Sequence, residues 1–333
     1  MEQFALDPRD ESPHPPERTE TFNESVYANG FDLKQKLGGW MRIGNRVNEG
    51  YAELSVCLYL PDGRIACQFG RPKISGNERF AAGGLSMDVI EPFKRFRMAY
   101  EGEVLLVDHP DQLRDPETGL KNAPRAPASV DWALEGVSPI HGGRPLRDDQ
   151  QTMYGRDFSL NHFNQHLRVT GRMSIGGQSW QLDGHGWRDH SWGPRIWQVI
   201  YSYRLLLCNF GDGCGFMLLK ITDKSGVSRR VGVLMVDHQY EDITDLDVTT
   251  TWAANGDPLA SALAVRTARR TALIKTEILS LAPLRNRRKA GDQVLVSRIW
   301  EGATRFTWDG KEGMGISEYI ERLDDGRLPG APV

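Results

Sequence analysis

The sequence has few cysteines, no excess of one charge and no long apolar run. Its 41 Lys and Arg nearly balance 44 Asp and Glu, which gives a formal net charge of −3. Proteins held on nucleic acid by a general positive field neutralise many phosphates with clustered Lys and Arg. A bilayer span needs roughly 18–20 consecutive apolar residues, whereas runs such as Val231–Val236 have only strand length. We therefore expect neither a nucleic-acid partner nor a membrane span.

The four cysteines, Cys57, Cys67, Cys208 and Cys214, show no CxxC spacing. In a chain of this length they are most simply interpreted as reduced core thiols of a cytoplasmic protein. The first residues lack a basic segment followed by an apolar one, so we expect no signal peptide. Because the first 20 residues carry four prolines and many charges, residues 1–30 are predicted to form a mobile N-terminal arm.

Short β segments separated by turn residues dominate the rest of the chain. Residues 51–60 and 65–69 flank Pro61-Asp62-Gly63-Arg64, a sequence typical of a hairpin turn. Residues 167–175 and 178–182 flank Gly176-Gly177, a second hairpin signal. Many short strands at this spacing predict an all-β fold, as an antiparallel sandwich or barrel. The best helix candidate, residues 257–270, fits a strand equally well.

Two polar stretches interrupt this pattern and indicate how the chain divides. Residues 108–128 contain four prolines, and residues 138–155 contain Gly142, Gly143 and Pro145. We place a domain boundary near residue 150, with one barrel over 31–150 and a second over 151–333. P-loop, GxGxxG and GxSxG motifs are absent, so nucleotide chemistry and an α/β-hydrolase site have no support.

The stretch Asp183–Arg195 concentrates the side chains that could do chemistry. It holds two His, two Asp, two Arg and two Trp among thirteen residues. If it begins as a strand, then Asp183, His185, Trp187 and Asp189 share one face. Inside a barrel, that face would line a ligand cavity. Core tryptophans and charges paired at a barrel rim are the alternative, purely structural interpretation, and residue types alone do not decide between the two.

This stretch also resembles a known group. The segment GHGWRDHSWGPR at Gly184–Arg195 is similar to AttH-like proteins, which are related to carotenoid hydratase (hydroxyneurosporene synthase). The similarity includes Asn161–His166 before this segment and Glu301–Tyr319 after it. Arg42–Gly50 is similar to the start of the first barrel in the bacterial branch of that group. The resemblance covers residues 35–325 in the order of the segments and in their motifs, and its specific part is RDHSWGPR.

The resemblance implies two lipocalin-like β-barrels in tandem, with the motif in the C-terminal one. Characterised relatives act on hydrophobic polyenes or polycyclic products by hydration, cyclisation or isomerisation. Many members of the bacterial branch have no assigned activity, so the resemblance speaks more strongly for the fold than for a reaction.

The residues suggest how such chemistry could proceed. Water addition to an alkene needs a positioned acid, and an apolar pocket can keep a carboxylic acid protonated. Asp189 is our first candidate for this acid, Glu318 the second and Asp183 the third. His190 or His185 could orient or deprotonate the water. The predicted ligand-binding residues, whose aromatic faces could stabilise a cation or whose polar groups could hold the ligand, are Trp187, Trp192, Trp197, Arg188, Arg195 and His166.

Each assignment has a purely structural alternative. Asp189 could simply pair with Arg188 or Arg195, and Glu318 could be a rim charge. A metal site is a competing interpretation, because imidazoles and carboxylates are metal ligands; the residues able to bind one are His185, His190, Asp183, Asp189 and the pair His162 and His166. There is no HExxH motif and no cysteine near these histidines, so we predict neither a metal nor a cofactor.

Two hypotheses follow, with a third behind them. The first is a cofactor-independent acid–base enzyme that hydrates, dehydrates, isomerises or cyclises a terpenoid, steroid or similar lipid. The second is a non-catalytic carrier of an apolar small molecule. The third, a structural or assembly role, would be favoured by barrels filled with side chains.

Overall fold

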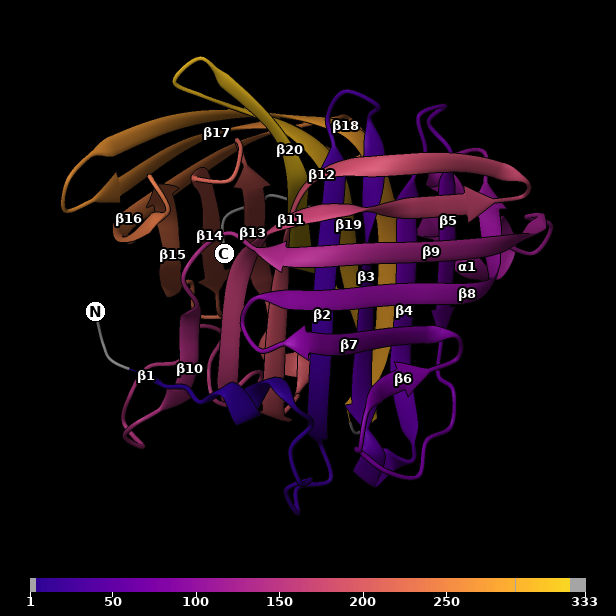
Figure 1. The fold of residues 1–333 in the computed structure, drawn as a ribbon, viewed down its shortest axis with the longest axis horizontal. Helices are drawn as coiled ribbons and strands as arrows, with labels where there is room; N and C mark the ends of the chain where they lie inside the picture. The colour runs from indigo at the N-terminus through magenta and orange to yellow at the C-terminus, as the bar shows by residue number, and fades with distance from the viewer. Residues whose placement is uncertain (1–3, 291, 324–333) are drawn as a thin grey trace. The chain divides into compact units, whose positions relative to one another are not determined.

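The computed structural model describes residues 4–290 and 292–323, and antiparallel strands make up most of it (Figure 1). The chain divides into two compact units. Unit 1 comprises Met1–Asp62, Ala66–Leu106 and Pro124–Ile196, and unit 2 comprises Gly63–Ile65, Val107–Ala123 and Trp197–Val333. The predicted all-β class is confirmed. No helix in the described part of the chain is both long and apolar enough to cross a membrane.

Unit 1 is a sheet that closes on itself. Its strands are β1 (Phe4–Ala5), β2 (Phe22–Asp32), β3 (Leu37–Arg46), β4 (Tyr51–Tyr59), β5 (Ile65–Gly70), β6 (Phe80–Ala82), β7 (Leu85–Glu91), β8 (Arg95–Val107), β9 (Arg125–Gly136), β10 (His141–Pro145), β11 (Asn161–Ile175) and β12 (Gln178–Pro194), with the 3₁₀ turns η1 (Pro8–Glu11) and η2 (Val47–Glu49).

The strand pairings run β11-β12-β2-β3-β4-β5-β8, and β9 pairs with both β8 and β11. These pairings complete a ring, and Figure 1 shows β7, β8 and β9 crossing in front of β2, β3 and β4.

The interior of unit 1 is filled with apolar side chains. Alternate residues of each strand point inward, and those of β2 and β3 meet as Val26 opposite Ile43 and Ala28 opposite Met41. All four belong to one buried cluster that reaches Trp132 on β9 and Leu182 on β12. The alternation that the sequence predicts is therefore present, but the interior that it builds is a packed core.

Unit 2 is a closed barrel of antiparallel strands. They are β13 (Ser202–Asn209), β14 (Cys214–Thr222), β15 (Ser228–Val236), β16 (Gln239–Trp252), β17 (Pro258–Thr267), β18 (Thr271–Ala290), β19 (Gln293–Trp308) and β20 (Lys311–Arg322), joined in that order. The short elements η3 (Pro110–Arg114), α1 (Pro116–Gly119) and η4 (Trp197–Val199) also belong to it. One apolar cluster draws residues from each strand from β13 to β19, which places it inside the barrel.

Three sequence-based boundaries need correction. The arm predicted over residues 1–30 holds η1 and most of β2, and it docks into unit 1 because Asp10 and Glu11 find buried partners there. The division between the units lies at Ile196 and Trp197, not near residue 150. Residues 138–155, interpreted as a linker, contain β10, which pairs with β11. The hairpin of β11 and β12, and with it the conspicuous motif, therefore belongs to unit 1.

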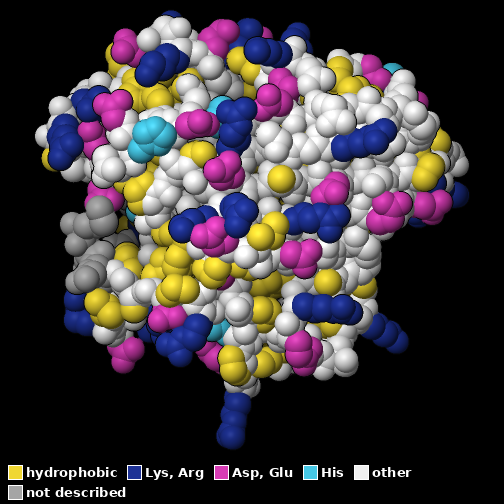
Figure 2. Space-filling model, in the orientation of Figure 1, with side chains coloured by type: hydrophobic (Ala, Val, Ile, Leu, Met, Phe, Trp, Pro, Cys, Tyr) yellow, Lys and Arg dark blue, Asp and Glu magenta, His cyan; other side chains and the backbone are white. Residues whose placement is uncertain are grey.

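The segment with both helix and strand character, residues 257–270, forms β17. On the face of the molecule shown in Figure 2, Lys and Arg side chains are interspersed with Asp and Glu. The near balance of charge in the sequence is thus also a mixed pattern of charged side chains on that face.

Candidate functional site

Strand β12 divides the motif between two faces of the unit 1 sheet. His190 lies opposite Val26 on β2 and Phe163 on β11, and Val26 belongs to the interior cluster. The even-numbered residues therefore point into the barrel, while Trp187 and Asp189 point outward. The prediction that alternate residues share a face is correct, but the face with Asp189 lies outside the ring of strands.

Two glycines of the motif allow β12 to lie close to β2. A Cβ atom at Gly184 would lie 2.0 Å from the carbonyl oxygen of Phe31, and one at Gly186 would lie 1.8 Å from that of Asn29. Real Cβ atoms do not approach backbone oxygens so closely, so any larger residue would push the two strands apart. These glycines therefore fix the spacing that positions the side chains on both faces.

The inward face carries a fully compensated guanidinium. Arg188 donates from Nη1 and Nη2 to the two carboxylate oxygens of Glu11, at 2.9 and 2.6 Å. It also donates from Nε to Oε1 of Gln165 at 3.0 Å, and its guanidinium carbon lies 3.9 Å from the centre of the Phe96 ring. Arg188 is fully buried. It therefore clamps η1 to the barrel interior, a structural role that replaces the predicted ligand-binding one.

A second buried network links β12 to the N-terminal segment. Oε1 of Glu24 accepts from Nδ1 of His14 at 2.6 Å and from Nε2 of His190 at 2.9 Å. Burial alone would raise the pKa of Glu24, but the hydrogen bonds and charges of the two histidines lower it to about 2. Burial opposes charge on His14, yet Glu24 and Asp10 raise the pKa of this imidazole. The His14 ring also stacks on Trp192, with centroids 4.0 Å apart and planes at 11°.

These three side chains have the chemistry of a cation site. The ligand atoms of His14, Glu24 and His190 all lie within 4.8 Å of one another, and such donors occur in zinc sites. In the structure, however, both ring nitrogens point at Glu24, which also accepts from the backbone N–H of His14 and from Asn77. A carboxylate with four donors is satisfied as an ion-pair network. His190 therefore belongs to a buried network that supports the fold, Trp192 stacks on that network, and their catalytic and binding roles remain predictions.

The outward face holds a looser pair. Nε2 of His162 on β11 lies 3.7 Å from Oδ2 of Asp189, whose side chain is 19 % exposed. On the other side of the ring, Nδ1 of His162 lies 3.4 Å from the amide nitrogen of Asn164. The distance of 3.7 Å exceeds that of a hydrogen bond, so the pair can tighten around a transferred proton.

Aromatic rings border this pair. The Tyr154 ring meets the His162 ring edge-on, with centroids 4.7 Å apart. The rings of His166 and Trp187 meet in the same way at 4.6 Å. All four of these side chains are buried. The outward face therefore combines two ionisable groups with buried aromatic rings.

Two further basic groups lie on the same side of unit 1. Arg195 donates from Nη2 to Oγ of Ser191 at 2.7 Å, and its guanidinium lies 4.3 Å from the Phe158 ring centre. Burial and the nearby Arg42 lower the pKa of Arg195 to about 10, although the charge of Asp189 acts in the opposite direction. Burial, followed by the charge of His162, lowers the pKa of His141 to about 4.

The remaining predicted residues do not join this site. Asp183 is exposed and forms an ion pair with Arg168 at 2.8 Å, so its predicted role as an acid has no geometric basis. His185, which is half-buried, lies opposite Arg168 and Phe31 near the same end of β12.

Glu318 and Trp197 belong to unit 2. Glu318 lies directly opposite Glu301 in the pairing of β19 and β20. Burial, and then the charge of Glu318, raises the pKa of Glu301 well above its ordinary value. Glu301 and Glu318 therefore form a pair of carboxyl groups in which the charged form of Glu301 is disfavoured.

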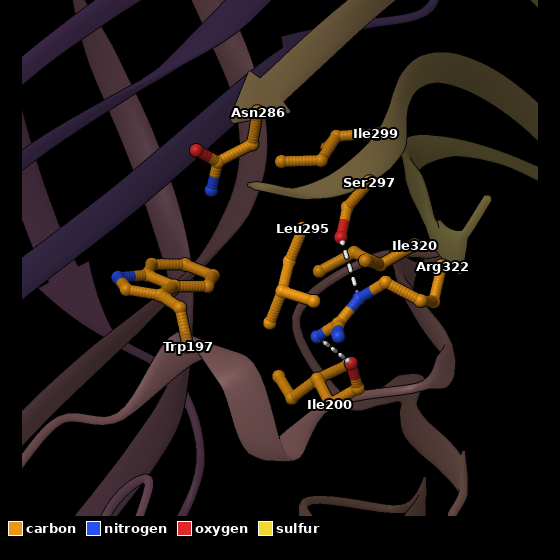
Figure 3. Close-up of a pocket in the computed structure, with 8 residues that line it drawn as sticks. All are labelled: Trp197, Ile200, Asn286, Leu295, Ser297, Ile299, Ile320 and Arg322. Atoms are coloured by element: carbon orange, nitrogen blue, oxygen red, sulfur yellow. Dashed lines mark hydrogen bonds between the residues drawn. The ribbon is translucent and has the colours of Figure 1, made fainter. Parts of the chain in front are cut away.

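Trp197 borders a pocket of unit 2 (Figure 3). Leu295, Ile299 and Ile320 form its apolar part. Arg322 donates to Oγ of Ser297 at 3.3 Å and to the carbonyl oxygen of Ile200 at 2.9 Å. The residues that line this pocket include no carboxylate and no imidazole. Acid–base chemistry therefore has better support on the outward face of β11 and β12.

Sequence reasoning missed the partners of the motif. His162 was considered only as a metal ligand, and Asn164 and Tyr154 were not considered. The alternation His162, Asn164, His166 on one predicted strand was a usable signal, because it places three polar groups on one face. The N-terminal partners Glu11, His14 and Glu24 gave no such signal.

Comparison with known proteins agrees with this architecture. The chain belongs to the family described as "Domain of unknown function (DUF7064)", whose model matches residues 7–322. A comparison with curated protein sequences gives no match.

Solved structures show the same fold. A proposed AttH from Nitrosomonas europaea is 17 % identical, with a TM-score of 0.64 over 95 % of this chain and 96 % of that one. Kievitone hydratase from Nectria haematococca is 10 % identical, with a TM-score of 0.54 over 90 % of each chain. CghA with Sch210972 is 10 % identical, with a TM-score of 0.58 over 97 % and 98 %. The resemblance to AttH-like proteins is thereby confirmed, and at these identities it concerns the fold.

Proposed function

We propose that this AttH-like protein is a cofactor-independent acid–base enzyme that acts on an apolar small molecule. The proposed substrate is a terpenoid, a steroid or a similar lipid, and the proposed reaction adds or removes water, shifts a double bond or closes a ring. The observation that carries the proposal is the His162–Asp189 pair within an aromatic border on the outward face of β11 and β12.

The two members of the pair have different tasks in this proposal. Asp189 is the more exposed, at 19 % against 4 % for His162, so its carboxyl group meets the substrate and exchanges a proton with it. In this proposal Nε2 of His162, which lies 3.7 Å from Oδ2 of the same carboxyl group, carries the ring proton. It donates to the carboxylate when Asp189 has given up its proton, and it fixes the carboxyl orientation throughout.

Neighbouring groups supply binding. The rings of Trp187 and Tyr154 offer apolar faces, which can also stabilise positive charge that develops on an alkene. The buried Oδ1 of Asn164 has no hydrogen-bond partner among the described residues. A buried acceptor of this kind is costly unless satisfied, and a hydroxyl group or a water at the reacting carbon would satisfy it.

The relatives agree with this reaction class without establishing it. One structural relative is named a hydratase, and CghA is seen with the small molecule Sch210972. Both share the fold with this chain at 10 % identity. Folds host many reactions, so the proposal depends on the pair and its border.

The test begins with the ligand that the protein retains. Native mass spectrometry of freshly purified protein, followed by solvent extraction, identifies any co-purified small molecule. That compound and its analogues are then incubated with wild type, His162→Gln and Asp189→Asn, with Asp183→Asn as a matched control on the same strand. We expect wild type and Asp183→Asn to change the mass by one water or to isomerise the compound, and both site variants to fail.

The carrier hypothesis predicts a different result. A carrier would return the compound unaltered after long incubation, and Trp187→Ala would weaken binding while Asp189→Asn would not. That combination would refute the proposed enzyme.

A further inference from the structure

The barrel of unit 2 carries a row of cations on its inner face. Arg204 on β13 lies opposite Lys220 on β14, and Lys220 lies opposite Arg230 on β15. These three strands are neighbours (Figure 1). Lys220 follows Leu218 by two positions, and Leu218 belongs to the interior cluster. Residues two apart on a strand share a face, so the row continues the interior surface beyond the apolar core.

Lys220, the middle member of this row, differs from its two neighbours in its charge partners. Arg204 pairs with Glu321, whose side chain is fully buried, and Arg230 lies 3.5 Å from Asp245. In the described residues, the ammonium group of Lys220 makes neither a hydrogen bond nor an ion pair. Burial and then the charges of Arg230 and Arg204 lower the pKa of Lys220, with Asp247 and Asp245 acting in the opposite direction. The position therefore favours an added negative charge.

Aromatic rings lie beside the row. The Arg204 guanidinium lies 4.6 Å from the centre of the Tyr319 ring and 5.6 Å from that of Trp252. The Trp252 ring meets the rings of Tyr319 and Trp300 edge-on, both at 5.8 Å. The Tyr319 hydroxyl is already engaged with Ser261. The surroundings of the row are therefore cationic at one side and aromatic at the other.

The row is also open to solvent at one end. The side chain of Arg230 is 36 % exposed, that of Arg204 is 12 % exposed, and Trp252 is half-buried. A small molecule can therefore approach Lys220 from the Arg230 side and extend toward the aromatic rings.

We propose that unit 2 holds a second ligand site, which binds an amphipathic monocarboxylate with its carboxylate on Lys220, between Arg204 and Arg230, and its apolar body against Trp252. An anion there pairs with Lys220 next to two guanidinium groups that already have carboxylate partners, and the aromatic rings accept an apolar chain or ring. This site is independent of the proton-transfer pair in unit 1, because it uses none of its residues.

A comparison of decanoate, decanol and inorganic phosphate tests the charged group and the apolar body of the proposed ligand separately. Isothermal titration calorimetry with the full-length protein measures binding of each to wild type, Lys220→Met and Lys275→Met. Lys275 is exposed on β18 and serves as the matched control. We expect wild type and Lys275→Met to bind decanoate equally, and Lys220→Met to bind it about tenfold to a hundredfold more weakly, the range for a hydrogen-bonded charge. Decanol and phosphate, which each lack one half of the ligand, should bind more weakly than decanoate.

The following results would overturn the proposed site or the proposed ligand. Decanoate that fails to bind wild type, or that binds Lys220→Met as tightly as wild type, overturns the proposal. Phosphate that binds as tightly as decanoate overturns the amphipathic ligand and leaves a site for free anions. Far-UV circular dichroism and the urea midpoint establish that Lys220→Met is folded, and Lys220→Gln, which keeps a polar group there, must show the same loss.

Discussion

The two faces of β12 carry similar residue types under different physical conditions. On the inward face, each of the three guanidinium nitrogens of Arg188 donates to the carboxylate of Glu11 or the carboxamide of Gln165. On the outward face, Asp189 faces His162 at 3.7 Å, beyond hydrogen-bond distance. Arg188 on the inward face is hydrogen-bonded and fully buried, whereas Asp189 on the outward face is partly exposed and can move closer to His162.

The difference follows from the cost of burying charge. An ionised group in a packed interior is tolerated only when it is paired and hydrogen-bonded. Arg188 and Glu24 meet that condition through the N-terminal segment, which supplies Glu11 and His14. A group that exchanges protons with a ligand must instead keep part of its surface available. The comparison teaches that the most strongly paired residues of the motif support the fold and the less strongly paired ones are available for chemistry.

The largest effect should come from breaking the Arg188–Glu11 pair. Arg188→Met leaves the Glu11 carboxylate buried without its partner, and we expect unit 1 to lose about 3–5 kcal/mol of unfolding free energy. Urea unfolding measures this loss. The double variant Arg188→Met/Glu11→Leu should recover most of it, because no unpaired charge remains; if the double variant is as unstable as the single one, the pair is not the cause.

The next effect is the pH dependence carried by Glu24. Its folded pKa of about 2 lies below the ordinary 4.5, so its contribution is present above pH 4.5 and is lost as the pH falls toward 2. The shift corresponds to at most about 3 kcal/mol. The raised pKa of His14 acts at the upper end of the pH range. The contribution of His14 to stability is present below its ordinary pKa and is lost as the pH rises through its pKa in the folded protein.

Glu24→Gln should abolish the dependence at low pH and weaken the one carried by His14, because Asp10 still raises the pKa of that imidazole. Unfolding midpoints measured from pH 2 to pH 9 would show a flatter profile than wild type at both ends. An unchanged profile would mean that His14 and His190 do not depend on Glu24 for their stabilisation.

Changes to the outward pair should affect turnover far more than stability. Asp189→Asn keeps size and polarity, and we expect it to change the unfolding free energy by less than about 1 kcal/mol, the usual range for a partly exposed pair. A lost proton-transfer group typically lowers the rate by about 10²–10⁴-fold. Urea unfolding and turnover of the ligand identified by extraction measure the two quantities, and wild-type turnover in Asp189→Asn would contradict the site.

The smallest effect should come from the exposed end of β12. Asp183 pairs with Arg168, and the two side chains are 69 % and 39 % exposed. Exposed pairs contribute less than about 1 kcal/mol, so Asp183→Asn should match wild type in both urea midpoint and turnover. A loss of turnover in this variant would show that the site extends further along the strand than the structure indicates.

The sequence predicted the grouping of side chains better than their surroundings. Alternation correctly placed Trp187 on the same face as Asp189. Alternation does not state which face is interior, because that depends on how the other strands close the ring. Nor could it find Glu11, which lies 177 positions from Arg188 along the chain. Charges that meet only after folding leave no local pattern, so the N-terminal segment was predicted to be a mobile arm.

The central claim is that neighbouring residues of β12 have different tasks because they lie on opposite faces. Urea unfolding of Arg188→Met and Asp189→Asn, measured side by side with wild type, tests it most directly. The account predicts a large drop in the midpoint for Arg188→Met and a midpoint close to wild type for Asp189→Asn. Equal drops in both variants would show that Asp189 is as structural as Arg188, and would contradict the account.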